Sequence, residues 1–94
     1  MRPDFARKAT VPEGVLFRQL GEESILLNLN SETYFGLDEV GTRIWDLVTS
    51  GLTIQEAYEV LLNEYEVPPE TLSKDIAALL EELLMKGLLV IAGE

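Results

Sequence analysis

The stretch Thr33–Trp45 constrains the fold most, because its residue pattern changes from strand to helix within a few positions. Its first three residues are β-branched or aromatic, and such side chains suit a pleated strand. After Gly36, Asp38 is placed to cap a helix, since its carboxylate can accept the free N–H groups of a first turn. Apolar residues then follow at helical spacing: Val40, Ile44, Leu47 and Val48. A sheet is therefore expected before this junction, and helices after it.

Three strands are expected, at Val15–Leu20, Ser24–Leu29 and Thr33–Leu37, each separated from the next by a short polar turn. Connections this short predict an antiparallel meander in which the third strand is an edge. Alternation in the second strand places three apolar residues on one face: Ile25, Leu27 and Leu29.

Three helices are expected after the sheet. The first runs from about Asp38 to Ser50, and the second opens at the capping box Thr53–Glu56. The third opens at Pro69 and carries an apolar stripe: Leu72, Ile76, Leu79, Leu80, Leu83 and Leu84. A small sheet cannot cover its own apolar face, so the helices must close over it. The sequence thus predicts a winged-helix-like α+β fold in the order β-β-β-α-α-α.

The chain is expected to form one domain over residues 15–94, preceded by an N-terminal arm over residues 1–14. Prolines and a glycine interrupt any periodicity in the arm. It is either disordered or packed along the domain through Phe5 and Val11. The short apolar segment Leu88–Ile91 is expected to pack back on the helices.

Composition argues against several function classes. The chain has no Cys and no His, which removes thiolate chemistry, the commonest general base and the usual metal ligands. Adjacent carboxylates such as Glu81 and Glu82 point about 100° apart on a helix and do not converge. No apolar run approaches the ~18 residues of a membrane span, and the N-terminus has no signal-peptide pattern. A non-enzymatic cytoplasmic protein without a metal or cofactor is expected.

The charge distribution disfavours nucleic acid as a partner. The net charge is −10, and a body this acidic repels phosphate backbones. The third helix, where a winged helix would read DNA, has four acidic and two basic residues: Glu70, Lys74, Asp75, Glu81, Glu82 and Lys86. A DNA-binding regulator is kept only as a rival hypothesis.

An open edge on Thr33–Leu37 favours peptide binding, because its unpaired N–H and C=O groups can bind an extended peptide. A groove could form between this edge and the residues that lie off the leucine stripe of the third helix, which include the small Ala77 and Ala78. Alternatively, the arm or a second copy of the chain covers the edge, and the module serves dimerisation.

Several motifs in this order resemble the PqqD family. They are Leu29–Gly41 with Ile44–Trp45, Gly51–Thr53, Glu64–Val67, Asp75–Ile76, Leu79–Leu80 with Leu83–Leu84, and Gly87–Leu89. This family comprises small peptide-binding proteins, also called RiPP recognition elements, that hold the leader region of a ribosomally made precursor peptide. The resemblance covers about Val15 to Val90. The segment Tyr34–Gly41 and the stand-alone length are most similar to the leader-binding proteins of lasso peptide biosynthesis.

The resemblance implies a non-catalytic adaptor that presents the leader to a separate leader peptidase, with a macrolactam-forming cyclase completing maturation. It implies that the leader adds as a strand to Thr33–Leu37 and lies against the third helix. The protein is expected as a monomer or weak homodimer, with no nucleic acid, membrane or cofactor partner. The runner-up within the family is a partner of a radical SAM maturase.

The expected peptide-binding residues are Leu27, Leu29, Thr33, Tyr34, Phe35, Lys74, Asp75, Ala78, Leu79 and Glu82. Thr33, Tyr34 and Phe35 would supply main-chain pairing and apolar contact, and the residues from 74 to 82 would line the helix side. Leu27 and Leu29 would share in apolar pockets. Tyr34 as a core residue stays open as an alternative, and Trp45 is expected in the core.

Overall fold

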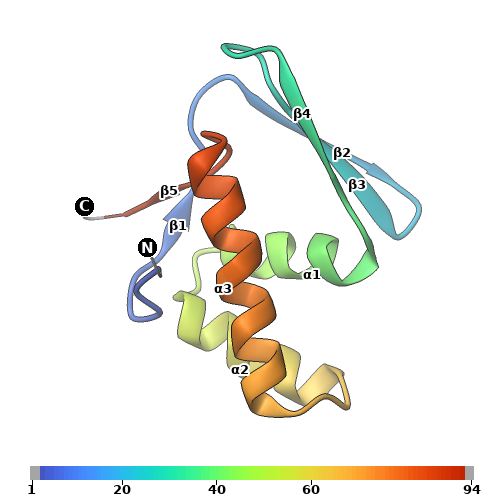
Figure 1. Cartoon of the computed structure of the whole chain (residues 1–94), viewed down its shortest axis with the longest axis vertical. Coiled ribbons are helices and arrows are strands. Elements are labelled where there is room, and N and C mark those ends of the chain that lie inside the picture. The colour runs from blue at the N-terminus through green and yellow to red at the C-terminus, as the bar shows by residue number, and fades with distance from the viewer. Residues whose placement is uncertain (1–2, 93–94) are drawn as a thin grey trace.

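A three-stranded antiparallel sheet precedes three helices, and a separate two-stranded ladder joins the ends of the chain (Figure 1). The computed structural model describes residues 3–92. The elements are β1 (Ala9–Thr10), β2 (Val15–Leu20), β3 (Glu23–Asn28), β4 (Thr33–Leu37), α1 (Glu39–Val48), α2 (Ile54–Glu64), α3 (Pro69–Met85) and β5 (Val90–Ile91). The expected α+β layout of a three-stranded sheet and three helices is confirmed, whereas β1 and β5 were not expected. Within residues 3–92, no helix is long and apolar enough to cross a membrane.

The sheet has the order β2-β3-β4, so β4 is an edge strand as expected. β2 and β3 are joined by a tight turn in which Gly21 has a φ of 66°, a conformation that glycine adopts without steric cost. β4 leads directly into α1, whose N-cap Asp38 accepts a hydrogen bond from the Gly41 N–H at 2.7 Å. Figure 1 shows this passage, with α3 upright at the centre of the view.

The core-facing side of β3 carries Ser24, Leu26 and Asn28, which are all buried. Ile25 and Leu27 do share a face, but it is the outer face of the sheet. The polar residues tolerate burial because they are hydrogen-bonded. The hydroxyl groups of Ser24 and Thr42 are 2.7 Å apart, and Asn28 Nδ2 donates to the Gly87 carbonyl at 3.2 Å. These bonds fasten β3 to α1 and to the end of α3.

The helices begin as the capping pattern predicts. Thr53 and Glu56 form a complete capping box at the start of α2. The buried face of α3 is formed by Leu72, Ile76, Ala77, Leu80 and Leu83. Trp45 is also in the core, where its ring stacks on Phe17 with centroids 6.0 Å apart.

The N-terminal segment packs along the domain. Ala9 pairs with Ile91 in the β1–β5 ladder, so the segment after α3 is held by β1. The Phe5 ring lies 6.2 Å from the Tyr58 ring, whereas Val11 is exposed. The division of the chain at residue 14 stays a prediction, and residues 1–2 and 93–94 lie outside the described part.

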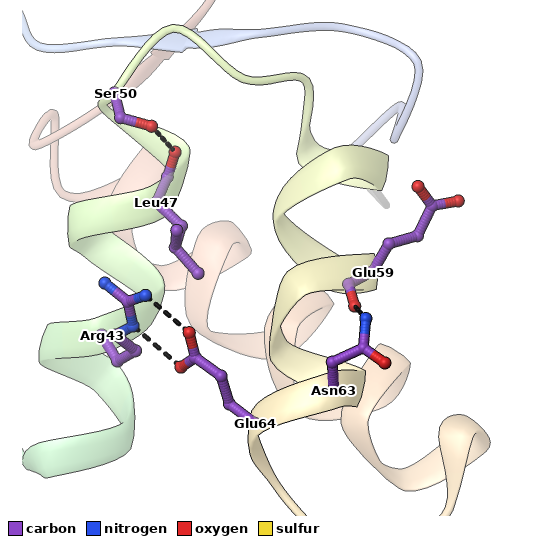
Figure 2. Close-up of polar contacts among 6 residues, drawn as sticks. All are labelled: Arg43, Leu47, Ser50, Glu59, Asn63 and Glu64. Carbon is purple, nitrogen blue, oxygen red and sulfur yellow. Dashed lines mark hydrogen bonds and ion pairs between the residues drawn. The ribbon is translucent and has the colours of Figure 1, made fainter.

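A bidentate ion pair links α1 to α2. Arg43 donates from Nε and Nη2 to the two carboxylate oxygens of Glu64, at 2.9 and 2.6 Å (Figure 2). The Arg43 hydrogen bonds hold the pKa of Glu64 below its ordinary value of 4.5. Because the folded-state pKa is lowered, the stabilisation is complete above pH 4.5 and is lost as the pH falls through the folded value.

We therefore expect Glu64→Gln to lower the free energy of unfolding at pH 7 by about 0.5–1 kcal/mol, the range for a partly exposed pair. The loss should shrink toward pH 3, where the wild-type carboxylate is itself protonated. Urea unfolding at both pH values measures this difference. Glu66→Gln is the matched control, since Glu66 has no hydrogen bond or ion pair within the described chain. An equal loss at pH 3 and pH 7 would contradict the assignment.

Candidate functional site

The free edge of β4 offers the backbone groups of two residues. Leu29 N donates to the Gly14 carbonyl at 2.8 Å, which makes this a hydrogen-bonded pair at the end of the β2–β3 ladder. Hydrogen-bonded pairs alternate with non-bonded pairs along an antiparallel ladder. A residue of the central strand β3 therefore directs both its N–H and its C=O to only one of the two neighbouring strands, β2 or β4. Following the register, the β4 residues that bond to β3 are Thr33, Phe35 and Leu37. Tyr34 and Gly36 therefore direct their N–H and C=O groups to the free edge.

A cavity of about 490 Å³ lies beside this edge, between β4, the start of α1 and α3. It is lined by Phe35, Gly36, Leu37, Asp38, Val40, Gly41, Ile44, Asp75 and Leu79. Four of these side chains are apolar and partly or fully buried, and the two carboxylates are exposed. We call this cavity, together with the free edge of β4, the β4–α3 groove.

A second hollow continues the groove along α3. Its lining residues are Lys74, Asp75, Ala77, Ala78 and Glu81. Asp75 belongs to both hollows and so marks where they meet. The expected small residues on this helix face are present, although Ala77 is itself buried.

The structure brings only some of the expected site residues together. Phe35, Asp75 and Leu79 line the groove, and Lys74 and Ala78 line the hollow beside it. Thr33 lies on the edge strand but bonds inward to β3. Glu82 is exposed on α3 and lines neither hollow.

Three expected residues lie away from the groove. The Tyr34 side chain is 75% exposed and points to the outer face of the sheet, so it is not part of the core. Leu27 lies on that same face, directly opposite Tyr34 in the register. Leu29 follows the end of β3 and is 53% exposed. Of these, only Tyr34 contributes to the open edge, through its backbone.

Sequence reasoning missed the contribution of α1. Val40 and Ile44 were assigned to an apolar stripe, but both line the groove, and Val40 is 38% exposed. Asp38, treated only as a cap, also lines the same cavity. The detectable signal was the position of these residues directly after the edge strand.

Positive charge lies at the other end of the groove. The Lys86 ammonium sits 5.9 Å from the centroid of the Phe35 ring, a cation–π contact. The backbone here is fixed to β3, because Asn28 Nδ2 donates to the Lys86 and Gly87 carbonyls. Lys86 lines neither hollow, but its ammonium contacts Phe35, which does line the groove, so two carboxylates lie at one end of the apolar lining and an ammonium lies beside the other.

A second cluster of titratable groups lies away from the groove. A hydrogen bond with Glu22 raises the pKa of Glu39, and this pair lies on the far side of α1 beside Arg43 and Tyr65. Within residues 3–92, no three metal-binding side chains come together. The chemistry that the groove offers is binding of an extended chain by backbone hydrogen bonds and apolar contact.

The outer face of the sheet carries several exposed apolar side chains, with Arg18 among them opposite Ile25. Leu16, Leu27 and Tyr34 form a row across the three strands, and Ile25 and Leu20 extend it. Leu16 and Leu20 are more than half exposed, at 52% and 54%. We call these five residues the outer patch.

The chain is similar to a known protein family and to solved structures. The family model of PqqD, described as coenzyme PQQ synthesis protein D, matches residues 23–89. The solved structure of TbiB1 in complex with the TbiA(beta) leader peptide superposes with a TM-score of 0.80. It is 34% identical, and the match covers 90% of this chain and 96% of that one.

A structure of lasso peptide synthetase B1 complexed with the leader peptide has the same fold, with a TM-score of 0.80 and 24% identity. That match covers 88% of this chain and 98% of the other. No curated protein matches the chain. The family model spans the sheet from β3 onward and all three helices. The chain thus belongs to the PqqD family and is a PqqD-like RiPP recognition element.

Proposed function

We propose that this protein is a non-catalytic adaptor that binds the leader region of a ribosomally synthesised precursor peptide, in lasso peptide biosynthesis. The observation that carries the proposal is the free edge of β4 beside an apolar groove. The similarity to TbiB1, which was solved with a leader peptide, supports it. We also propose that the sheet and three helices are a variant of the winged helix, supported by their small α+β layout.

In this proposal the leader lies extended along β4 and pairs with the N–H and C=O groups of Tyr34 and Gly36. Alternate side chains of a strand point to opposite faces. One set therefore enters the groove and contacts Phe35, Val40 and Leu79, while the other set points outward. Main-chain bonds supply affinity for any extended peptide, and the apolar floor supplies selectivity.

The bound leader is then presented to a leader peptidase, with a cyclase as a further partner. Holding the substrate on an adaptor raises its effective concentration at the enzyme without new contacts to the cleavage site. We propose the outer patch as the surface that meets the peptidase, because exposed apolar patches of this kind mark interaction sites. The patch stays open when the β4 edge is occupied. A net charge of −10 disfavours stacking of two copies, in keeping with a monomer or weak homodimer.

The outer patch is tested by Ile25→Asp. We expect unchanged leader affinity but leader removal by the partner peptidase slowed about ten-fold or more, since a charge would be buried at the interface. Val67→Asp is the matched control, because Val67 is 38% exposed against 39% for Ile25 and lies in the α2–α3 connection. If the peptidase removed the leader from the Ile25→Asp variant at the wild-type rate, the outer patch would not be the surface that meets the peptidase.

The function itself is tested by fluorescence anisotropy with the fluorescein-labelled leader of the precursor encoded beside this protein. We expect saturable binding at about micromolar concentration, or roughly −8 kcal/mol, and none for a scrambled leader. A labelled DNA duplex tests the rival regulator and should not bind, given the acidic surface of α3. Equal binding of leader and scrambled peptide would contradict the proposal.

A further inference from the structure

We infer that the β4–α3 groove selects its peptide by charge order: a basic side chain at the Asp38–Asp75 end and an acidic side chain at the Lys86 end. The two charges would lie three to five residues apart in the bound peptide. This inference rests on the proposed function, since it describes which peptides the same groove accepts.

The acidic end has two carboxylates that are free to bind a cation. The Asp75 side chain is exposed at the groove and makes no hydrogen bond or ion pair within the described residues. Asp38 uses one oxygen to cap α1 and leaves the other available. The groove lining contains no basic residue. In the adjoining hollow, Lys74 is the single base against Asp75 and Glu81.

The basic end has a cation that no described carboxylate neutralises. Lys86 follows α3 and places its ammonium over the Phe35 ring. Glu82 lies one turn earlier, but no ion pair joins these two side chains in residues 3–92. Lys86 also lies at the negative end of the α3 dipole, which helps to hold the cation there. An acidic peptide side chain that reached this point would therefore meet an available partner.

The spacing follows from two elements. β4 and α3 run in opposite directions along the groove, since Asn28, the partner of Thr33, bonds to Gly87, while Leu37 shares the cavity with Asp75. The eleven helical steps from Asp75 to Lys86, the C-cap of α3, span about 16 Å. Three positions of extended chain from Phe35 to Asp38 span about 10 Å. These distances correspond to three to five residues of a bound strand.

Charge order selects a sequence because the direction of the peptide is set by the sheet. The sheet is antiparallel and antiparallel pairing is the slightly more stable kind, so the peptide runs antiparallel to β4 and its basic residue precedes its acidic one. With the order reversed, an acidic side chain would face Asp38 and Asp75, and a basic one would face Lys86. Like-charge contacts of this kind suppress wrong partners. The groove would thus reject the reversed order even where the apolar residues fit.

The test is a selection from a random 12-residue mRNA-display library on immobilised full-length protein. We expect wild-type protein to enrich peptides with a base and an acid three to five positions apart in one fixed order. The double variant Asp75→Lys/Lys86→Glu should enrich the opposite order. A peptide selected on the wild-type protein should bind the Asp75→Lys variant about five-fold or more weakly. It should bind the control variant Glu66→Lys less than about two-fold more weakly. Thermal melts followed by circular dichroism establish that each variant is folded.

The outcomes separate this inference from the proposed function. In one outcome, wild-type protein enriches only apolar peptides with no charge order, and these peptides fail to bind the Tyr34→Pro variant. That result would overturn the charge inference and leave strand addition standing. The same charge order on wild type and double variant would also overturn the inference. Enrichment of no peptide by wild-type protein would overturn both.

Discussion

Tyr34→Pro should lower leader affinity about 100-fold or more while the domain stays folded. Proline removes the N–H that faces the free edge, its ring blocks the incoming strand, and a buried leader carbonyl is left without a donor. The substitution should cost little stability, because edge strands tolerate proline where the N–H faces solvent. Anisotropy titration measures the affinity, and circular dichroism measures the fold.

Tyr34→Ala is the matched control for this prediction. It keeps the N–H and removes only a side chain that points to the outer face, so leader affinity should stay within about three-fold of wild type. Phe35→Pro should behave differently again, because that N–H bonds to β3 and its loss disrupts the sheet. A folded Tyr34→Pro protein that binds the leader as wild type does would rule out strand addition at β4.

Leu80→Ala should lower the free energy of unfolding by about 2–5 kcal/mol, the usual cost of emptying a fully buried leucine site. Such a loss is a large part of the stability of a domain this small. The side chain does not line the groove, so leader affinity of the folded protein should be unchanged. Chemical denaturation and anisotropy titration measure the two effects separately.

Leu79→Ala tests the neighbouring position. Here we expect a small loss of stability and a large loss of leader affinity, the reverse of Leu80→Ala. Leu79 is half-buried and lines the groove, so truncation should cost only about 1 kcal/mol of stability. Leader affinity should fall about ten-fold, the effect of removing one apolar anchor. Equal affinity losses in both variants would show that the groove does not distinguish these two leucines.

Local signals allowed most of the elements to be predicted. The Asp38 cap, the Thr53–Glu56 capping box and the break at Pro68–Pro69 each depend on residues within one helical turn. The edge position of β4 followed from short connections alone. Predictions of this kind succeed because every interaction that fixes the boundary lies close in the sequence.

The core-facing side of β3 could not be predicted in the same way. The alternation of residue types suggests that the face with Ile25 and Leu27 is buried and the face with Ser24 and Asn28 is exposed. The structure has the opposite arrangement. Ser24 and Asn28 can be buried because their side chains form hydrogen bonds with Thr42 and Gly87. Those partners are 18 and 59 positions away in the sequence. The β1–β5 ladder is a similar case, since strands of two residues leave no periodic signal.

The site was only partly accessible from the sequence. Phe35, Asp75 and Leu79 were named through the family resemblance, and all three line the groove. Val40 was assigned to the apolar stripe of α1, because periodicity cannot tell a buried residue from one at the edge of a cavity. Leu27 lies on the outer face of the sheet, because the opposite face of β3 is held inward by hydrogen bonds to residues distant in the sequence.

Amide hydrogen exchange at Tyr34 and Gly36, followed by NMR with and without saturating leader peptide, tests strand addition most directly. Both amides face the free edge, so they should exchange rapidly in the free protein and slowly in the complex. Thr33, Phe35 and Leu37 should be protected in both states, because they bond to β3. Saturation with the leader that leaves Tyr34 and Gly36 exchanging as rapidly as before would contradict the account.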